Sequence, residues 1–485
     1  MELHEYAGFD ATELAELVRR GEVTAAELAR LARQAHDQVK PAINAVVEFY
    51  EDAESVPGSD TGFFGGVPFL RKDLGPSEAG RLQEMGSRLF QGFRPTVDSY
   101  FTQRARAGGL RIVGRTTVPE MGMGGVPGLS ESVACGITRN PWNLDRTTGG
   151  SSSGSAAAVA AGIVPIAHAN DGGGSIRIPS SFCGLVGMKP SRGRVSAGPN
   201  KQDGSEGRVH DFVVCRSVRD MAAALDIFQG ASPGDPFIIA PPQRAYLEEL
   251  RHPTGRLRIG VASPFREEVH ALVQPGVRVA VEKTAELLES MGHSIDKFAL
   301  PYDPADLKMV EAGLNYISFA SLDAEARALG RTVDEQTVEP IILELYRISK
   351  ERPLADAALV KEGLRKIRAE VGSATKDFDI LLTPTMPFTA LPHGTWTEIP
   401  SAEPVTAQGF LDAWAALDQY LSVFNFTGQP AVSLPLFQGS DGLPIGIQIV
   451  GRFGDEATLV RVARDLEEAM PWAMRRPPVF AGSAK

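Results

Sequence analysis

The sequence predicts an α/β fold, and two regions of the chain support this prediction. Between residues 65 and 214, short apolar segments alternate with helical segments and with turns rich in glycine and proline, as in a sheet covered by helices. A second strand-rich stretch starts at Leu257 and is followed by a helix over residues 277–291. A chain of 485 residues can form two or three ordinary domains, or one large α/β domain with insertions.

Residues 1–60 are predicted to form helices that pack on the core. Two capping-box pairs mark helix starts, namely Asp10 with Glu13 and Thr24 with Glu27. We expect Gly21 and Pro41 at the breaks between these helices, because both residue types favour helix ends. No chemistry is predicted for this region.

Residues 61–235 are predicted to form the core that carries the chemistry. The expected elements are a strand ending at Lys72, a helix over 101–107, a strand over 110–114, a buried small-residue helix over 155–162 and a strand over 163–167. The run Ser-Pro-Gly-Asp-Pro at residues 232–236 is a candidate boundary after this core.

The remainder of the chain is predicted to form an outer region and then to return to the core. Residues 236–376 are predicted to be peripheral and mostly helical, and the charged part over 306–376 forms an outer layer or, alternatively, a cap over the site. Residues 377–485 are predicted to supply core strands over 378–384, 430–436 and 445–450, together with a C-terminal helix.

Composition excludes several classes of protein. Apolar residues make up 43% and charged residues 22% of the chain, which is typical of a soluble globular protein. The net charge of −11 argues against nucleic acid or an anionic membrane as a partner. No apolar run reaches the length of a membrane span, and the first residues lack the basic start of a signal peptide. Three scattered cysteines and eight histidines show no metal-binding spacing, so we expect a cytoplasmic protein without metal or cofactor.

The stretch over residues 149–179 contains two serines beside glycines, Ser151 and Ser175. Three glycines, Gly172, Gly173 and Gly174, run directly into Ser175 and can aim backbone N–H groups at an oxygen beside this hydroxyl, as in an oxyanion hole. A linker would not lead into an alanine-rich helix and an apolar strand. A phosphate-binding loop would need a lysine after the glycines, and the Gly-x-Ser-x-Gly turn of α/β-hydrolases is absent around Ser175.

Three motifs of the chain are Gly-Gly-Ser-Ser-Ser-Gly-Ser at 149–155, Asp-Gly-Gly-Gly-Ser-Ile-Arg-Ile-Pro at 171–179 and Gly-Val-Pro-Phe-Leu-Arg-Lys-Asp-Leu at 66–74. By these motifs the chain resembles the amidase signature hydrolases over nearly its whole length. Further matching segments lie at 114–120, 138–143, 183–190, 424–431 and 442–449, in the order of the family. The resemblance implies one domain over residues 1–485, with a large mixed β-sheet covered by helices on both faces.

The resemblance also implies a catalytic triad of Lys72, Ser151 and Ser175, in which a cis peptide holds Ser151 and Ser175 is the nucleophile. Ser175 follows Ser151 by 24 residues, as the family leads one to expect. A serine hydroxyl needs a base to become a nucleophile, and Lys72 can be that base only in its neutral form, which burial favours. Ser151 would pass the proton between them, since a hydroxyl both donates and accepts.

Other residues of these motifs receive secondary roles. Ser152, Ser153 and Ser155 are interpreted as structural, and Arg177 with Asp171 as a pair that supports the loop. The run over 121–128 is rich in glycine, whereas relatives often have polar or aromatic side chains that line the pocket there. Gly172 replaces a bulkier residue that is common in the family. Substrate binding is therefore predicted in a wide, apolar pocket at four residues: Met123, Gly124, Gly125 and Cys135.

Within the family, the segments at 138–144, 167–171 and 191–199 look most like those of the 6-aminohexanoate cyclic dimer hydrolases. The leading prediction is an amidase that acts on an uncharged, largely apolar amide, with cyclic or linear oligoamides, anilides and aryl carbamates as candidates. Two alternatives are a glutamyl-tRNA amidotransferase subunit, which works inside a complex, and a catalytically silent scaffold. The only partner predicted is a small-molecule amide, although a homodimer is common in the family.

Overall fold

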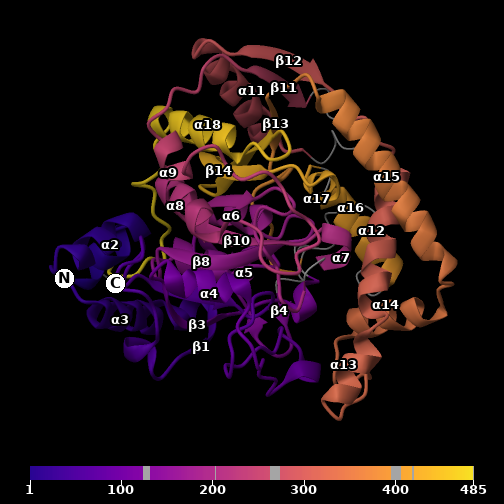
Figure 1. Cartoon of the computed structure of the whole chain (residues 1–485), viewed down its shortest axis with the longest axis horizontal. Helices are drawn as coiled ribbons and strands as arrows, with labels where there is room; N and C mark the ends of the chain where they lie inside the picture. The colour runs from indigo at the N-terminus through magenta and orange to yellow at the C-terminus, as the bar shows by residue number, and fades with distance from the viewer. Residues whose placement is uncertain (124–130, 202–203, 263–272, 395–405, 418–419, 484–485) are drawn as a thin grey trace.

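The computed structural model describes residues 1–123, 131–201, 204–262, 273–394, 406–417 and 420–483, and most of its strands form one mixed sheet (Figure 1). Eleven strands pair in the order β1 (Val46–Phe49), β3 (Arg111–Thr116), β2 (Pro68–Lys72), β8 (Ile166–Asp171), β10 (His210–Cys215), β9 (Val186–Lys189), β14 (Ala431–Gln438), β15 (Pro444–Gly451), β13 (Ile380–Pro384), β11 (Arg258–Ala262) and β12 (Ser294–Phe298). Two hairpins lie outside this sheet, β4 (Glu131–Ser132) with β5 (Gly136–Ile137) and β6 (Arg139–Asn140) with β7 (Asn143–Thr147). The predicted α/β class is confirmed.

The directions of three inner strands bring polar residues together at the same end of these strands. Strands β2 and β8 run parallel, so their carboxyl ends, which carry Lys72 and Asn170, point the same way. Strand β10 runs antiparallel to β8 and brings Asp211 opposite Asn170 and His210 opposite Asp171. In sheets of this kind, ligands bind beyond the carboxyl ends of the strands.

Helices cover both faces of the sheet. On β15, a Cβ added at Gly446 would meet the Ser181 side chain of α6 (Arg177–Cys183), whereas one added at Gly451 would meet Leu459 of α18 (Glu456–Ala469). The two positions differ by an odd number of residues, and successive residues of a strand point to opposite faces. Helices α6 and α18 therefore lie on opposite sides, as predicted for this fold.

The small-residue segment forms a fully buried helix, α5 (Ser153–Ala160), as expected. Small side chains let this helix approach the sheet closely, and it contacts β2, β3, β8 and β10. A Cβ at Gly154 would lie only 2.2 Å from the Ala45 carbonyl oxygen, so this position requires glycine. The strand expected directly after this helix begins later, as β8, because a turn of residues 161–165 intervenes.

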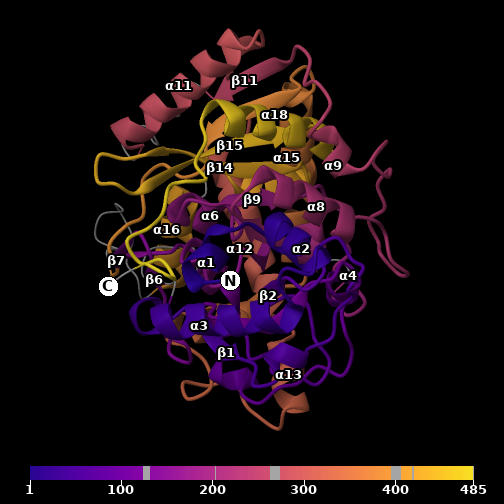
Figure 2. The ribbon, with the colours of Figure 1, turned by 90° about the vertical axis from the view of Figure 1, so that its left-hand side faces the viewer.

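The N-terminal helices α1 (Leu3–Gly8), α2 (Ala11–Arg19) and α3 (Ala25–Ile43) lie across one end of the sheet (Figure 2). Both predicted capping boxes are present, and Gly21 has a φ of +72° between helices. The prediction for Pro41 was wrong: this proline lies inside the last turn of α3, which Asn44 ends in a left-handed conformation. The edge strand β1 was also not predicted within this region, since four residues are too few for a clear pattern.

The region over 236–376 contains the sheet strands β11 and β12 as well as helices, so it is not peripheral throughout. Its helices are α9 (Tyr246–Glu249), α11 (Pro275–Ser290), α12 (Pro304–Phe319), α13 (Leu322–Ala328), α14 (Pro340–Glu351) and α15 (Ala355–Thr375). Helices α12 to α15 form a layer along one side of the molecule, as the orange ribbon of Figure 1 shows. The other α-helices among the described residues are α4 (Tyr100–Ala107), α8 (Val218–Phe228), α16 (Ala407–Leu417) and α17 (Ser422–Thr427), and the short segment α7 (Gly204–Gly207) contains two non-glycine residues with positive φ. Within the described ranges, no helix is both long and apolar enough to cross a bilayer.

Candidate active site

The side chain of Lys72 is completely buried at the end of β2 and contacts three polar groups. Its Nζ atom lies 2.7 Å from Ser151 Oγ, 3.0 Å from Ser152 Oγ and 2.6 Å from Asn170 Oδ1. Burial lowers the pKa of Lys72 from 10.5 to about 7, and the nearby carboxylates of Asp211 and Asp171 act in the opposite direction. An amine with this pKa can take up and release a proton near neutral pH.

Ser151 and Ser175 line one cavity and are almost fully buried, with 2% and 5% of their surfaces exposed. The peptide bond between Gly150 and Ser151 is cis, as the resemblance implied. Ser175 lies in the short loop that leads from β8 into α6. The structure therefore brings Ser151 and Ser175 to one cavity, and Lys72 contacts Ser151 without lining the cavity itself.

The loop before Ser175 is held by a buried ion pair. Arg177 donates through Nε and Nη2 to the two carboxylate oxygens of Asp171, each at 2.9 Å, and Asn425 Nδ2 donates to Asp171 Oδ1 at 2.9 Å. Burial raises the pKa of Asp171, but the Arg177 guanidinium and the Asn425 amide outweigh this effect and hold the pKa well below its usual range. The expected supporting pair is therefore present and charged.

The predicted oxyanion role of Gly174 needs correction. The N–H group of Gly174 donates to Asp171 Oδ1 at 2.7 Å, so this donor already has a carboxylate partner. Gly172 and Gly173 both line the cavity, and for them the oxyanion role remains a prediction.

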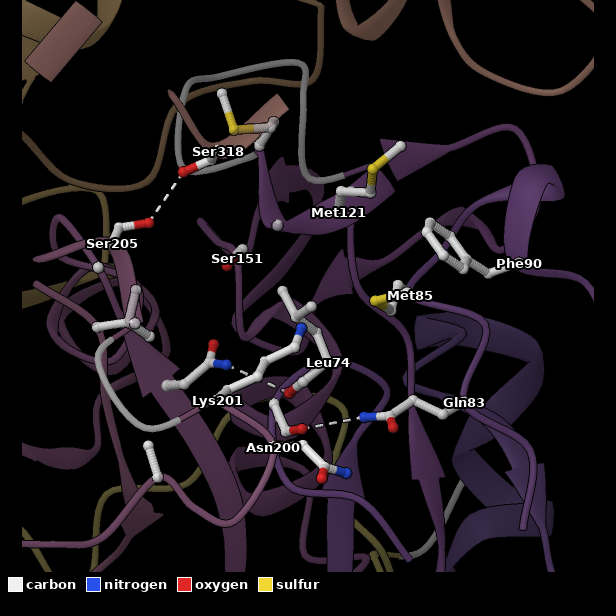
Figure 3. A pocket seen from close by; sticks show the side chains of 18 of the residues that line it. Leu74, Gln83, Met85, Phe90, Met121, Ser151, Asn200, Lys201, Ser205 and Ser318 are labelled. Atoms are coloured by element: carbon white, nitrogen blue, oxygen red, sulfur yellow. Dashed lines mark hydrogen bonds between the residues drawn. The ribbon is translucent and has the colours of Figure 1, made fainter. Parts of the chain in front are cut away.

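The cavity has a volume of about 780 Å³, and side chains of several elements form its walls. Figure 3 shows Met85, Phe90 and Met121 on one side, and on the other Ser205 and Ser318, whose hydroxyls are 2.9 Å apart. This volume lies within the range of pockets that enclose drug-sized ligands. The cavity is wide, as predicted, but it is not purely apolar. Charged side chains that also line it are Arg94, Lys201, Arg208, Asp211, Glu311 and Glu325.

Only part of the predicted substrate pocket can be compared with this cavity. Met123 lines it, whereas Gly124 and Gly125 lie outside the described residues. Cys135 does not line the cavity; it lies in the turn of the β4–β5 hairpin, where its backbone N–H donates to Ser132 Oγ and its carbonyl accepts from Asn44 Nδ2. The predicted binding role of Cys135 is therefore not supported by its position.

Helix α12 forms part of the cavity wall, so the layer over 306–376 does more than cover the outside of the fold. Glu311, Asn315 and Ser318 all line the cavity, and their spacing along the helix places them on one face. Phe319 and Leu322 continue this wall toward α13.

A family model described as Amidase matches residues 22–460. The chain belongs to the amidase signature family. A 6-aminohexanoate-cyclic-dimer hydrolase of Paenarthrobacter ureafaciens is 38% identical to it over 98% of each chain. A putative amidase of Mycobacterium tuberculosis is 36% identical over 97% of each chain. A solved structure of 6-aminohexanoate cyclic dimer hydrolase complexed with substrate has a TM-score of 0.89 and 36% identity, covering 98% of this chain and 99% of that one. The protein is therefore an amidase, a hydrolase of amide carbon–nitrogen bonds, and the predicted resemblance is confirmed.

Three side chains of this amidase site were not singled out from the sequence. Ser152 was interpreted as structural but contacts Lys72, and Asn170 and Asp211 were given no role. A signal for Asn170 existed: in the buried strand β8, His168 and Asn170 alternate with alanines, so two polar side chains share one face. Asp211 had no comparable local signal, because only the pairing of β10 with β8 brings it to the site.

Removing the guanidinium of Arg177, which pairs with Asp171, is expected to destabilise the amidase strongly. Arg177→Leu leaves the buried carboxylate of Asp171 without its ion-pair partner, which costs about 3–5 kcal/mol in comparable buried pairs. Urea unfolding should show a correspondingly lower midpoint. The double variant Asp171→Asn/Arg177→Leu should regain part of the lost stability, since it contains no uncompensated charge. If the double variant loses as much stability as the two single changes together, the two residues do not act as a pair.

Removing the charge of Asp211 is expected to shift the pH profile of the amidase. Asp211 lies near Lys72, on the far side of the Asn170 amide that Lys72 contacts. A Cβ built on Gly75 would lie 2.7 Å from Asn170 Nδ2 and 2.8 Å from Asp211 Oδ1, so the amide and the carboxylate are neighbours. Because the carboxylate of Asp211 raises the pKa of Lys72 against the effect of burial, Asp211→Asn lowers this pKa further. The acidic limb of the kcat/KM profile, which reports ionisations of the free enzyme, should move to lower pH. An unchanged limb, or one moved to higher pH, contradicts this coupling.

Proposed function

We propose that the enzyme cleaves an uncharged, largely apolar amide through an acyl-enzyme on Ser175. The single observation that supports this most is the buried Lys72 amine, which lies 2.7 Å from Ser151 Oγ, while Ser151 and Ser175 line the same cavity. A serine hydroxyl becomes an effective nucleophile when a positioned base removes its proton. With a pKa near 7, Lys72 is available as this base at neutral pH.

In the proposed reaction, neutral Lys72 takes the proton of Ser151 while Ser151 takes that of Ser175. Ser175 Oγ then attacks the amide carbonyl carbon, and the N–H groups of Gly172 and Gly173 stabilise the oxyanion. Lys72 returns the proton through Ser151 to the leaving nitrogen, the C–N bond breaks and the amine departs. Water then attacks the ester carbonyl by the same proton route and releases the acid, so that Ser175 is restored.

The relatives and the cavity together suggest the substrate class. Two of the most similar proteins, from Paenarthrobacter ureafaciens and a Pseudomonas strain, carry the name 6-aminohexanoate-cyclic-dimer hydrolase, so a cyclic oligoamide is our leading substrate candidate. Apolar lining residues such as Leu74, Met121 and Trp414 suit methylene chains, and the cavity can enclose a ring of this size. Aryl amides and aryl carbamates remain alternatives that the same cavity accommodates.

Product identification by mass spectrometry tests the proposal. The purified protein and Ser175→Ala each receive one pool that contains a cyclic dilactam, an anilide, an aryl carbamate, a primary amide and glutamine. We expect cleavage of the dilactam by the wild-type protein alone, and an acyl adduct on the peptide that contains Ser175 after acid quenching. Cleavage of the anilide or carbamate instead would support an aryl amidase or urethane hydrolase. Reaction of glutamine alone, or of nothing in the pool, would overturn the proposal of a self-sufficient amide hydrolase.

A further inference from the structure

A buried carboxylate, that of Asp211, lies in the wall of the catalytic cavity. Asp211 is on β10 and lines the same cavity as Ser151 and Ser175, although only 7% of its surface is exposed. Among the residues that the structure describes, no lysine or arginine forms an ion pair with it. A charge at this depth is costly unless partners compensate it, so the partners of its two oxygens decide what the residue can do.

The first carboxylate oxygen, Oδ1, is held by His168 on the neighbouring strand β8. His168 Nε2 and Asp211 Oδ1 are 3.1 Å apart, and the imidazole is completely buried. Burial lowers the pKa of His168, which makes the ring neutral, and a carboxylate can only accept, so Nε2 carries the hydrogen. The bare Nδ1 atom has no hydrogen-bond partner. His168 therefore fixes the orientation of the carboxylate without neutralising its charge.

The second carboxylate oxygen, Oδ2, is accessible from the cavity and has no donor. No described residue donates to it, and the atom is not enclosed by protein. Gly75 keeps this part of the wall open, because its φ is +107° and a Cβ there would lie 2.8 Å from Asp211 Oδ1 and 3.2 Å from His168 Cε1. A side chain at position 75 would therefore cover the carboxylate, whereas glycine leaves it uncovered.

Gln83 supplies a second acceptor at the same part of the wall (Figure 3). It lines the cavity with 6% of its surface exposed. Its Nε2 donates to the carbonyl oxygens of Gly75 and Pro76, at 3.2 and 3.4 Å. In the described part of the chain nothing donates to its Oε1. Since Gly75 borders both Gln83 and Asp211, two acceptors without donors lie beside one another.

A pair of such acceptors selects a ligand that donates. A carboxylate oxygen and an amide oxygen both accept hydrogen bonds and cannot donate them. A nitrogen that carries hydrogen satisfies these atoms. A ligand without a donor would displace water from Oδ2 and leave the charge without a partner, which penalises that ligand.

We propose that Asp211, with Gln83 beside it, forms a subsite that accepts a hydrogen bond from a second nitrogen of the substrate, away from the bond that is cleaved. This inference rests on the proposed function and narrows it to amides that carry a second nitrogen donor. In a cyclic or linear oligoamide, the donor is the N–H of the neighbouring amide. A terminal ammonium offers the same chemistry, and the test below separates the two sources.

Four ligands of equal chain length test the subsite by binding to Ser175→Ala, which cannot form an acyl-enzyme with them. All are N,N-dimethylhexanamides, so their common amide carries no N–H. At carbon 6 they bear an acetamido group, with a neutral N–H, an N-methylacetamido group, without one, an ammonium, or hydrogen. Titration followed by ligand-observed NMR gives the dissociation constants. That of the acetamido compound is expected to lie about 10- to 100-fold below that of its N-methyl counterpart, the usual worth of a hydrogen bond to a charged group.

The ammonium ligand identifies the source of the donor. Tighter binding of the ammonium compound than of the acetamido compound would assign the subsite to a charged amino terminus. The reverse order would assign it to the N–H of a second amide. In both cases the ligand that bears only hydrogen at carbon 6 should bind more weakly than the donor-bearing ligand that is preferred.

Variants of Asp211, made in the Ser175→Ala protein, test which residue is responsible. In Asp211→Asn, Oδ1 can still accept from His168, so Nδ2 takes the place of Oδ2 and a donor replaces the acceptor. The preference for the acetamido over the N-methylacetamido ligand should then be lost or reversed. Asp211→Leu should bring the ratio of the two dissociation constants to about one. Glu325→Leu is the matched control, since Glu325 also lines the cavity but is exposed to solvent, and it should leave the ratio unchanged.

Several outcomes overturn the subsite. A ratio near one in Ser175→Ala does so, and so does the absence of binding by all four ligands. A preference that persists in Asp211→Asn also does so, because the N-methyl group then clashes with another part of the wall. Equal effects of Glu325→Leu and Asp211→Leu would indicate only the general potential of the cavity. Thermal unfolding checks that the variants fold, and the isosteric Asp211→Asn keeps the test decisive if Asp211→Leu does not.

The binding test and the cleavage test fail independently of each other. Cleavage of the dilactam by the wild-type protein and not by Ser175→Ala supports the proposed function, whatever the four ligands show. If the wild-type protein cleaves nothing, but the preference for a donor is present and is lost in Asp211→Asn, the subsite stands and the proposed function fails. Equal binding of the acetamido and N-methylacetamido ligands by a protein that cleaves the dilactam overturns the subsite alone.

Discussion

Replacing Ser175 with alanine is expected to lower kcat/KM for the amide substrate by about 10⁴-fold or more, the loss seen when a serine nucleophile is removed from a hydrolase. In the proposed reaction Ser175 is the only group that bonds to the substrate, so its removal leaves positioning and oxyanion stabilisation alone. The side chain is small and nearly buried beside glycines, and alanine fits the same space. Stability should therefore change little while turnover is lost, which thermal unfolding and a continuous amidase assay can measure together.

Ser180→Ala is the matched control for this variant. Ser180 lies five residues further along, in α6, and its hydroxyl donates to the Ile176 carbonyl oxygen at 2.8 Å. It is as buried as Ser175, but it does not line the cavity. Its loss should reduce activity less than about tenfold through small shifts of α6. Comparable losses in both variants would indicate that the effect of Ser175→Ala is a disturbance of the loop, and retained activity in Ser175→Ala would exclude Ser175 as the nucleophile.

The parts of this enzyme that the sequence predicted are those determined by local pattern. The buried helix α5 follows from its run of small residues, and the two N-terminal capping boxes follow from their spacing. Lys72, Ser151 and Ser175 could be selected because each belongs to a motif of the family, and in the structure Ser151 and Ser175 line one cavity while Lys72 contacts Ser151. The prediction for Pro41 failed because α3 continues past this proline to Ile43, although the proline contributes no backbone N–H to the helix.

The parts that the sequence did not reveal depend on pairing between distant segments. Asp211 reaches the site because β10 pairs antiparallel with β8, and the register of that pairing is not visible in either strand alone. Glu311 lies 136 residues after Ser175 on a helix whose charged pattern resembles that of any outer layer. The hydrogen bond from Gly174 N–H to the Asp171 carboxylate was also not predicted, because the run of three glycines does not show which of their N–H groups already has a partner. Residues in local motifs could be predicted from the sequence, whereas the packing of distant segments that forms the cavity walls could not.

Lys72→Met is expected to lower kcat/KM by about 10³-fold or more, because removal of a general base typically costs between 10² and 10⁴ and no second amine contacts Ser151 within the described residues. The same variant also tests the buried state of the amine through stability. In the folded protein the pKa of Lys72 is about 7, whereas an unfolded lysine keeps its proton up to about pH 10.5. Between these values the unfolded chain holds one proton more, so the free energy of unfolding of the wild-type protein rises with pH.

The expected slope from this single group is about 1.4 kcal/mol per pH unit between pH 7 and pH 10, and it is absent below pH 7, where both states hold the proton. Urea unfolding at pH 6, 7, 8 and 9 measures it as the difference between the wild-type protein and Lys72→Met, which should grow in favour of the wild type by about 2–3 kcal/mol from pH 7 to pH 9. Lys283→Met is the control, since Lys283 is exposed on α11 and its ammonium meets water in both states, so it should show no such trend. A flat difference for Lys72→Met would mean that Lys72 remains protonated in the folded enzyme at neutral pH. It then could not act as the base that activates Ser175, even if the variant were inactive.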